Sequence, residues 1–130
     1  MALNVLVVDD STVMRRVIMR TLAMSGLPVG NVLEAANGQE ALSVLGQTSV
    51  DLALLDLNMP VVGGIEALER IRSGEATADL PVVVVSTEGS EPRIDRVREL
   101  SAGFVRKPFT PEALVDAIVV ALAGKGHVHA

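Results

Sequence analysis

Short runs of apolar residues alternate along this chain with longer segments in which apolar residues recur at helical spacing. Nearly continuous Val and Leu is typical of parallel strands covered on both faces, and an apolar stripe every three or four positions is typical of a helix with one buried side. The runs predict strands at 4–9, 31–35, 51–56, 81–86 and 103–106. The stripes predict helices at about 12–25, 38–46, 64–73, 91–101 and 111–123.

Residues at the predicted helix ends support these boundaries. Gly26 follows the first helix, Gly63 precedes the third, and Thr110 followed by Pro111 is typical of a cap and first helical turn. Strict alternation of strand and helix predicts a parallel sheet with right-handed crossovers and helices on both faces. In such sheets ligands bind beyond the carboxyl ends of the strands, where the strand order reverses.

Three carboxylates, two hydroxyls and one ammonium follow the predicted strands and would share that edge of the sheet. Two carboxylates about 4 Å apart repel by roughly 4 kcal/mol at an effective dielectric constant near 20, so an ionised trio needs a cation. Oxygen ligands at a partly hydrated site favour Mg²⁺. The residues are Asp9, Asp10, Asp56, Ser86, Thr87 and Lys107.

Composition narrows the classes of protein that fit. With 130 residues and 49% apolar content, the chain is long enough for one hydrophobic core and too short for two ordinary domains. We therefore expect a domain at 1–124, a short tail at 125–130 and no output domain. The net charge of −5 argues against nucleic acid as a partner. Neither a spanning apolar run nor a leader pattern is present and cysteine is absent, so we expect no membrane partner and a cytoplasmic location.

The motifs at the strand ends together resemble the receiver domains of two-component response regulators, in particular the stand-alone chemotaxis type. They are "VVDDS" (7–11), "LLDLNMP" (54–60) with "GG" at 63–64, "VVVST" (83–87) and "FVRKPF" (104–109). The resemblance implies a flavodoxin-like, doubly wound α/β fold: a parallel sheet of five strands in the order 2-1-3-4-5, with five helices. It also implies a switch rather than a turnover enzyme, phosphorylated by a histidine kinase or histidine phosphotransfer protein and read by a separate downstream protein.

The resemblance assigns the phosphorylation chemistry by position. Asp56 corresponds to the phosphoacceptor, whose acyl phosphate is the active signal. Asp10 matches the direct ligand of Mg²⁺ and Asp9 a ligand acting largely through water. Asn58 would bind the ion through its backbone carbonyl, and Asp56 completes the expected metal site.

Other implied roles concern the phosphoryl group once it is attached. Lys107 matches the lysine that pairs with the phosphoryl oxygens, through a peptide bond to Pro108 that is cis in the family, and Ser86 matches the hydroxyl that moves to bond one of them. Asn58 and Glu88 match positions beside the path of the attacking water. Their polar character resembles that of members that dephosphorylate themselves rapidly, so we expect a short-lived phosphoryl state.

Signal output is expected at the surface formed by the fourth helix, the fifth strand and the fifth helix. In the family, an aromatic residue on the fifth strand that takes part in switching is often tyrosine. Here Phe104, which has no hydroxyl, takes its place. The fifth helix is apolar on two sides, which fits either a broad contact with the sheet or a partner surface, including a weak homodimer. The candidate contact residues are Ile94, Phe104, Arg106 and Val115, with Arg93 and Arg96 to steer an acidic partner.

Several alternatives remain open on the residues alone. Asp10 or Ser11 could cap the first helix, and Asp56 could begin a turn. Ser86 and Thr87 could bind local backbone, and Ile94 and Val115 could be core residues. The coincidence of the aspartate pair, Asp56, Ser86 with Thr87, and Lys107 at the strand ends favours a shared site.

Two other classes of protein fit less well. An aspartyl-phosphate hydrolase of the haloacid dehalogenase type expects Asp-x-Asp and a cap insertion, whereas this chain has adjacent aspartates and no room for a cap. A flavodoxin-like FMN carrier needs a hydroxyl-rich phosphate loop and usually aromatic flanks, whereas this chain has two Phe and no Trp or Tyr. Among receivers, chemotaxis, phosphorelay and phosphate-sink roles all fit.

Overall fold

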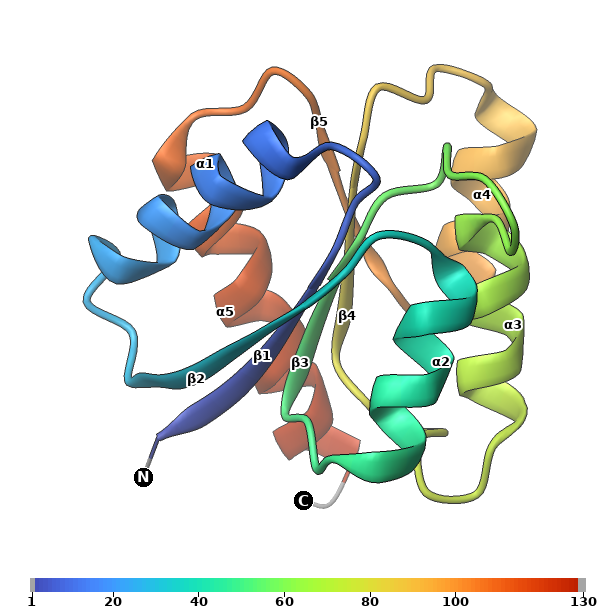
Figure 1. Ribbon diagram of the computed structural model, residues 1–130, viewed down its shortest axis with the longest axis horizontal. Helices are drawn as coiled ribbons and strands as arrows, with labels where there is room; N and C mark the ends of the chain where they lie inside the picture. The colour runs from blue at the N-terminus through green and yellow to red at the C-terminus, as the bar shows by residue number, and fades with distance from the viewer. Residues whose placement is uncertain (1, 129–130) are drawn as a thin grey trace.

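The structure is a computed structural model that describes residues 2–128, and for residues 125–128 it describes the backbone alone. Strands and helices alternate strictly along this range (Figure 1). The strands are β1 (Leu3–Val8), β2 (Val29–Ala35), β3 (Leu52–Leu55), β4 (Val82–Ser86) and β5 (Gly103–Arg106). The helices are α1 (Thr12–Ala23), α2 (Gly38–Gln47), α3 (Gly64–Ser73), α4 (Glu91–Glu99) and α5 (Pro111–Val128).

All five strands are parallel and lie in the order β2-β1-β3-β4-β5, which confirms the expected fold and strand order. The register then decides which residues meet at the carboxyl edge. Val8 pairs with Leu55, and the Asp56 amide donates to the Val8 carbonyl at 3.0 Å. Between β4 and β5, at the same carboxyl edge, the Lys107 amide donates to the Ser86 carbonyl at 2.9 Å. The residues that follow β1, β3, β4 and β5 therefore share one edge.

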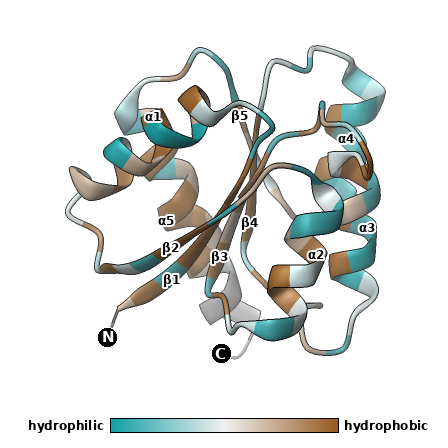
Figure 2. Ribbon diagram, viewed as in Figure 1, coloured by the Kyte–Doolittle hydropathy of each residue, from teal (hydrophilic) through white to brown (hydrophobic). Residues whose placement is uncertain are grey.

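Helices cover both faces of the sheet, and each face has its own hydrophobic core. Alternate residues of a strand point to opposite faces. Thus Leu6 packs with the core under α2, α3 and α4, while Val7 packs with the core under α1 and α5. Figure 2 shows the strands as the most hydrophobic elements, lying between the two helical layers. Burial of both faces explains why the strands read as near-continuous apolar runs.

Local chemistry at the helix starts places the loops around the carboxyl edge. The Ser11 hydroxyl accepts from the Met14 amide at 3.1 Å, so Ser11 rather than Asp10 caps α1. At Gly64, a Cβ would collide with the Asp56 carbonyl oxygen and approach the Leu57 Cα to 2.5 Å. Glycine therefore allows the start of α3 to lie directly against the residues that follow β3.

The observed boundaries differ from the predicted ones at a few ends. β2 begins at Val29 instead of 31, because Leu3 of β1 pairs with Val29 and supplies the partner that local sequence does not reveal. α4 ends at Glu99 instead of 101, and Ser101 has a φ of 59°, outside the helical range. α5 continues to Val128, into the segment expected to be a tail. Between residues 2 and 128, no helix combines the length and apolar character needed to cross a bilayer.

Candidate functional site

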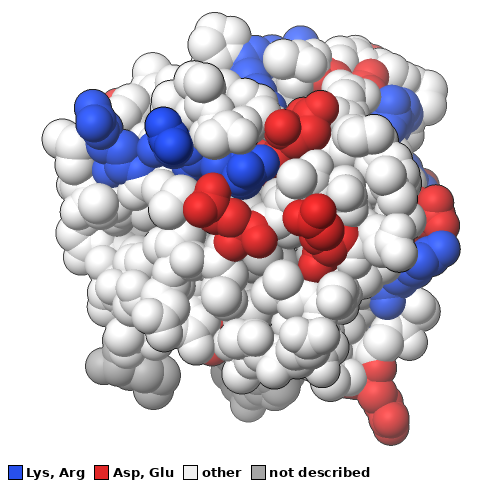
Figure 3. All heavy atoms as spheres, in the orientation of Figure 1, with Lys and Arg blue, Asp and Glu red and all other residues white. Residues whose placement is uncertain are grey.

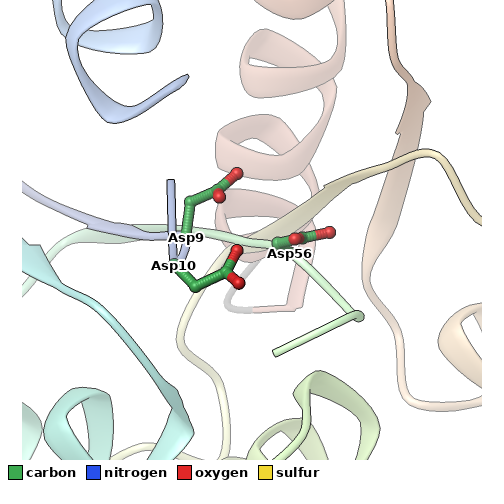
Figure 4. A group of neighbouring side chains, drawn as sticks. All are labelled: Asp9, Asp10 and Asp56. Atoms are coloured by element: carbon green, nitrogen blue, oxygen red, sulfur yellow. The ribbon is translucent and has the colours of Figure 1, made fainter. Parts of the chain in front are cut away.

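Three carboxylates come together at the carboxyl edge, from the turn after β1 and the end of β3. One oxygen each of Asp9, Asp10 and Asp56 lies within 4.8 Å of the others (Figure 4). Asp9 and Asp56 are buried, at 1% and 6% exposure, whereas Asp10 is exposed. The cluster therefore has a buried floor and one side open to solvent.

Lys107 brings a positive charge into this cluster from the end of β5. Its Nζ donates to Asp9 Oδ2 at 2.7 Å and lies 3.7 Å from Asp56 Oδ2. The peptide bond between Lys107 and Pro108 is cis, as the resemblance implied. One ammonium thus faces three carboxylates, and a net negative charge remains.

Asp56 is a buried carboxylate whose charge is only partly compensated. Burial raises its pKa above the ordinary value of 3.8, and the nearby Lys107 charge opposes this rise. Its Oδ1 atom is buried and, among the described residues, has no hydrogen-bond partner. Buried polar atoms are normally paired, so this oxygen is available to a further ligand. A hard cation would satisfy it, and carboxylate oxygens are the donors that Mg²⁺ prefers, so these residues fit Mg²⁺.

Of the two hydroxyls at the end of β4, only that of Ser86 is buried. Its Oγ accepts from the Glu88 amide at 3.3 Å, while Thr87 is exposed. Ser90, not Ser86 or Thr87, occupies the position that caps α4. The Ser86 hydroxyl therefore binds local backbone in this structure and lies at the same edge as Asp56 and Lys107.

The loops after β3 and β4 are joined by an arginine from α4. Arg93 Nη1 lies 2.7 Å from Glu88 Oε1 and 3.5 Å from Asn58 Oδ1. The second contact is long for a hydrogen bond, so the ion pair is the stronger of the two. Sequence reasoning placed Glu88 and Asn58 at the site but assigned Arg93 to a partner surface.

Arg15 of α1 is a second residue that sequence reasoning missed. Its Nη1 donates to the Asp9 carbonyl at 2.6 Å, and its Nε pairs with Glu34 Oε1 at 2.8 Å. This side chain fixes the backbone that carries the first carboxylate. Figure 3 shows basic side chains gathered on this face beside a group of acidic ones. The only sequence signal was an arginine five residues after Asp10, near the start of the predicted helix.

The candidate output residues divide between two parts of the molecule. Phe104 is half-buried against the core under α4, and Arg106 is exposed at the end of β5. Ile94 is only 9% exposed, so it is a core residue and not part of an exposed contact surface as we expected. The helical period explains this, because Ile94 and the buried Val97 lie on one side of α4.

Val115 is also placed differently from the expected output surface. It lines a groove of about 870 Å³ between α1 and α5, together with the exposed Val13 and Met24. Further along α5, Val119 and Val120 are exposed, so the sheet does not cover the second apolar side of this helix at these positions.

Arg96 does not present a free charge for steering. It pairs with Glu69 at 2.9 Å and with Glu99 at 3.2 Å. Since Arg93 pairs with Glu88, both arginines are balanced by carboxylates of the same chain.

Comparisons with known proteins agree with this geometry. The family described as response regulator receiver domain matches residues 5–119. The chemotaxis protein CheY homolog of Campylobacter jejuni strain 81-176 is 37% identical over 120 residues, covering 89% of each chain. CheY1 of Helicobacter pylori strain 26695 is 35% identical over 124 residues, covering 92% of this chain and 97% of that protein. The structure of Vibrio cholerae CheY4 crystallised at low pH matches with a TM-score of 0.83 and 32% identity, covering 94% of this chain and all of that chain.

Proposed function

Because this chain belongs to the response regulator receiver domain family and is a phosphorylation-activated signalling switch, we propose that Asp56 is the residue that accepts the phosphoryl group. The carrying observation is the buried Asp56 oxygen without a partner, beside two further carboxylates and Lys107. An Asp56 oxygen would attack the phosphorus of a phosphohistidine on a kinase or phosphotransfer protein. The P–N bond breaks, its electron pair stays on the imidazole, and an acyl phosphate forms.

The surrounding charges support this assignment. A phosphoryl group adds negative charge to a cluster that already holds three carboxylates and one ammonium. Asp9, Asp10, Asp56 and the Asn58 backbone carbonyl would hold Mg²⁺, which supplies charge neutralisation and orientation for the transfer. Lys107 is placed to donate to the phosphoryl oxygens after transfer, since its Nζ is already 3.7 Å from Asp56 Oδ2.

Output would begin at Ser86. Its buried hydroxyl would turn from the Glu88 amide toward a phosphoryl oxygen and leave space for the Phe104 ring to move inward. Because Val84 pairs with Phe104 and Ser86 with Arg106, such a shift would reach the exposed side of β5. The switch would then bind a separate protein with an affinity that differs between the two states, which is how phosphorylation drives binding.

The same site would end the signal by hydrolysing its own acyl phosphate, with Asn58 and Glu88 beside the path of the attacking water. We place the receiver at 1–124 and the switch in the cytoplasm.

Incubation with acetyl phosphate and Mg²⁺, followed by intact-mass measurement, tests the proposal. Wild type and the exposed control Asp116→Asn should gain one phosphoryl group, and Asp56→Asn none. Equal labelling of Asp56→Asn would contradict the assignment.

A further inference from the structure

A small network of side chains crosses the opening between the two loops that follow Asp56 and Ser86. The Glu88 carboxylate is held at both oxygens: Oε1 by Arg93 at 2.7 Å and Oε2 by the Ser90 amide at 3.0 Å. The same Arg93 nitrogen lies 3.5 Å from Asn58 Oδ1. Residues from the β3–α3 loop, the β4–α4 loop and the first turn of α4 are thereby joined.

The burial of the two partners shows which of them is constrained. The Glu88 side chain is 12% exposed, whereas that of Arg93 is 42% exposed. A carboxylate with so little access to water depends on its protein partners, because an unpaired buried charge is costly. Arg93 is therefore the residue that keeps Glu88 in its position beside the loop.

We propose that Arg93 is a positioning residue that holds Glu88 and Asn58 across the mouth of the site and thereby prolongs the phosphoryl state of Asp56. This inference rests on the proposed function. In hydrolysis, water attacks the phosphorus, the bond to the Asp56 oxygen breaks, and its electron pair returns to the carboxylate while the water proton leaves to solvent. A Glu88 carboxylate engaged by Arg93 and the Ser90 amide has less capacity to accept a hydrogen bond from that water. Breaking the ion pair frees the carboxylate and loosens the contact between the loops.

The experiment measures decay of the phosphorylated protein after the phosphodonor is removed. Wild type, Arg93→Ala, Arg93→Lys and Arg96→Ala are labelled with acetyl phosphate and Mg²⁺ and followed by intact mass. Arg96 is a matched control, since it lies on the same helix with the same 42% exposure but pairs with Glu69 and Glu99. Arg93→Ala should decay about two- to five-fold faster, the range expected for losing a partly exposed ion pair. Arg93→Lys should restore most of the lifetime, and Arg96→Ala should match wild type.

A second pair of variants separates positioning from a general loss of structure. In a Glu88→Ala background, Arg93→Ala should not accelerate decay, because the carboxylate that Arg93 holds is absent. High salt should accelerate decay of wild type toward the Arg93→Ala rate and leave Arg93→Ala nearly unchanged.

Three results would overturn the inference while leaving the phosphoacceptor assignment intact. They are an unchanged or slower decay of Arg93→Ala, an equal acceleration in the Glu88→Ala background, and an equal effect of Arg96→Ala. A wild-type protein that takes up no phosphoryl group would instead overturn the proposed function, and this inference with it.

Discussion

The Lys107 ammonium lies between two buried carboxylates, 2.7 Å from Asp9 Oδ2 and 3.7 Å from Asp56 Oδ2. In this structure its hydrogen bond goes to Asp9. A phosphoryl group on Asp56 would compete for the same ammonium with more charge and more acceptor oxygens. Lys107 therefore links the charge on Asp56 to Asp9, one of the carboxylates expected to hold the metal.

The first prediction concerns the pH dependence of phosphorylation. Asp56 can act as a nucleophile only when its carboxyl group is ionised. Burial raises the pKa of this group, and the Lys107 charge opposes the rise. Replacing Lys107 by Met removes that charge, so the pKa of Asp56 should rise further. The rate of labelling by acetyl phosphate should then fall at a higher pH in Lys107→Met than in wild type, and Lys107→Arg should stay closer to wild type. Identical pH profiles for all three proteins would contradict this electrostatic coupling.

The second prediction concerns Mg²⁺ affinity. Asp10→Asn removes one charged oxygen ligand from the carboxylate cluster while keeping the shape of the side chain. The affinity for Mg²⁺ should fall by about tenfold or more. Because the chain has no Trp or Tyr, titration calorimetry is better suited than intrinsic fluorescence. The exposed Asp116→Asn serves as the control, and an affinity for Asp10→Asn equal to this control would show that Asp10 is not a ligand.

The third prediction concerns stability without Mg²⁺. The raised pKa of Asp56 means that the folded state holds this proton more tightly than the unfolded state. Stability therefore begins to fall as the pH rises past the pKa of Asp56 in the unfolded chain, near 3.8. The full loss is reached once the pH exceeds the raised pKa of Asp56 in the folded state. Asp56→Asn should raise the free energy of unfolding by about 1–3 kcal/mol at neutral pH.

This difference should disappear below the unfolded pKa, where wild type is protonated in both states. Denaturant unfolding at several pH values, followed by circular dichroism, measures it. Added Mg²⁺ should reduce the advantage of Asp56→Asn, because binding stabilises the folded wild type. A wild type that is more stable than Asp56→Asn at neutral pH without metal would refute the prediction.

The fourth prediction concerns transmission from Ser86 to Phe104. The chain has only two phenyl rings, Phe104 and Phe109, and they pack against opposite cores. Phosphorylation should shift the NMR signals of the Phe104 ring strongly and those of Phe109 little. Ser86→Ala should accept the phosphoryl group without the Phe104 shift, and Phe104→Ala should remain phosphorylatable but lose phosphorylation-dependent partner binding. A Phe104 ring that is insensitive to phosphorylation in wild type would remove it from the output route.

The sequence predicted the positions of Asp9, Asp56, Ser86 and Lys107 well because each lies at the carboxyl end of a strand: Ser86 is the last residue of β4, and the other three directly follow β1, β3 and β5. In a parallel sheet, the residues after the strands must meet at one edge, so no knowledge of side-chain conformation was needed. The strand order came from the family resemblance, since the apolar pattern of a strand does not name its neighbours. The start of β2 at Val29 was missed because Gly30 is a poor strand former and because Val29 pairs with Leu3, which is distant in the sequence.

Other residues could not be placed from local spacing. The periodicity of α5 shows two apolar sides, and only the packing of the helix on the sheet decides that Leu114 is buried and that Val115 lines the groove with α1. The partners of Arg15 and Arg93 depend on how a long side chain reaches across a loop. Such contacts are absent from any pattern of hydrophobic and polar positions.

The most direct test of the account locates the phosphoryl group on the wild-type chain. Borohydride reduces an aspartyl phosphate to homoserine with loss of phosphate, and this change can be assigned by tandem mass spectrometry. After cleavage at glutamates, Asp51 and Asp56 lie in one peptide, so Asp51 is an internal control. Phosphorylation with Mg²⁺ followed by reduction should produce homoserine at position 56 and at no other aspartate. Homoserine at Asp9, Asp10 or Asp51 in place of Asp56 would contradict the central claim.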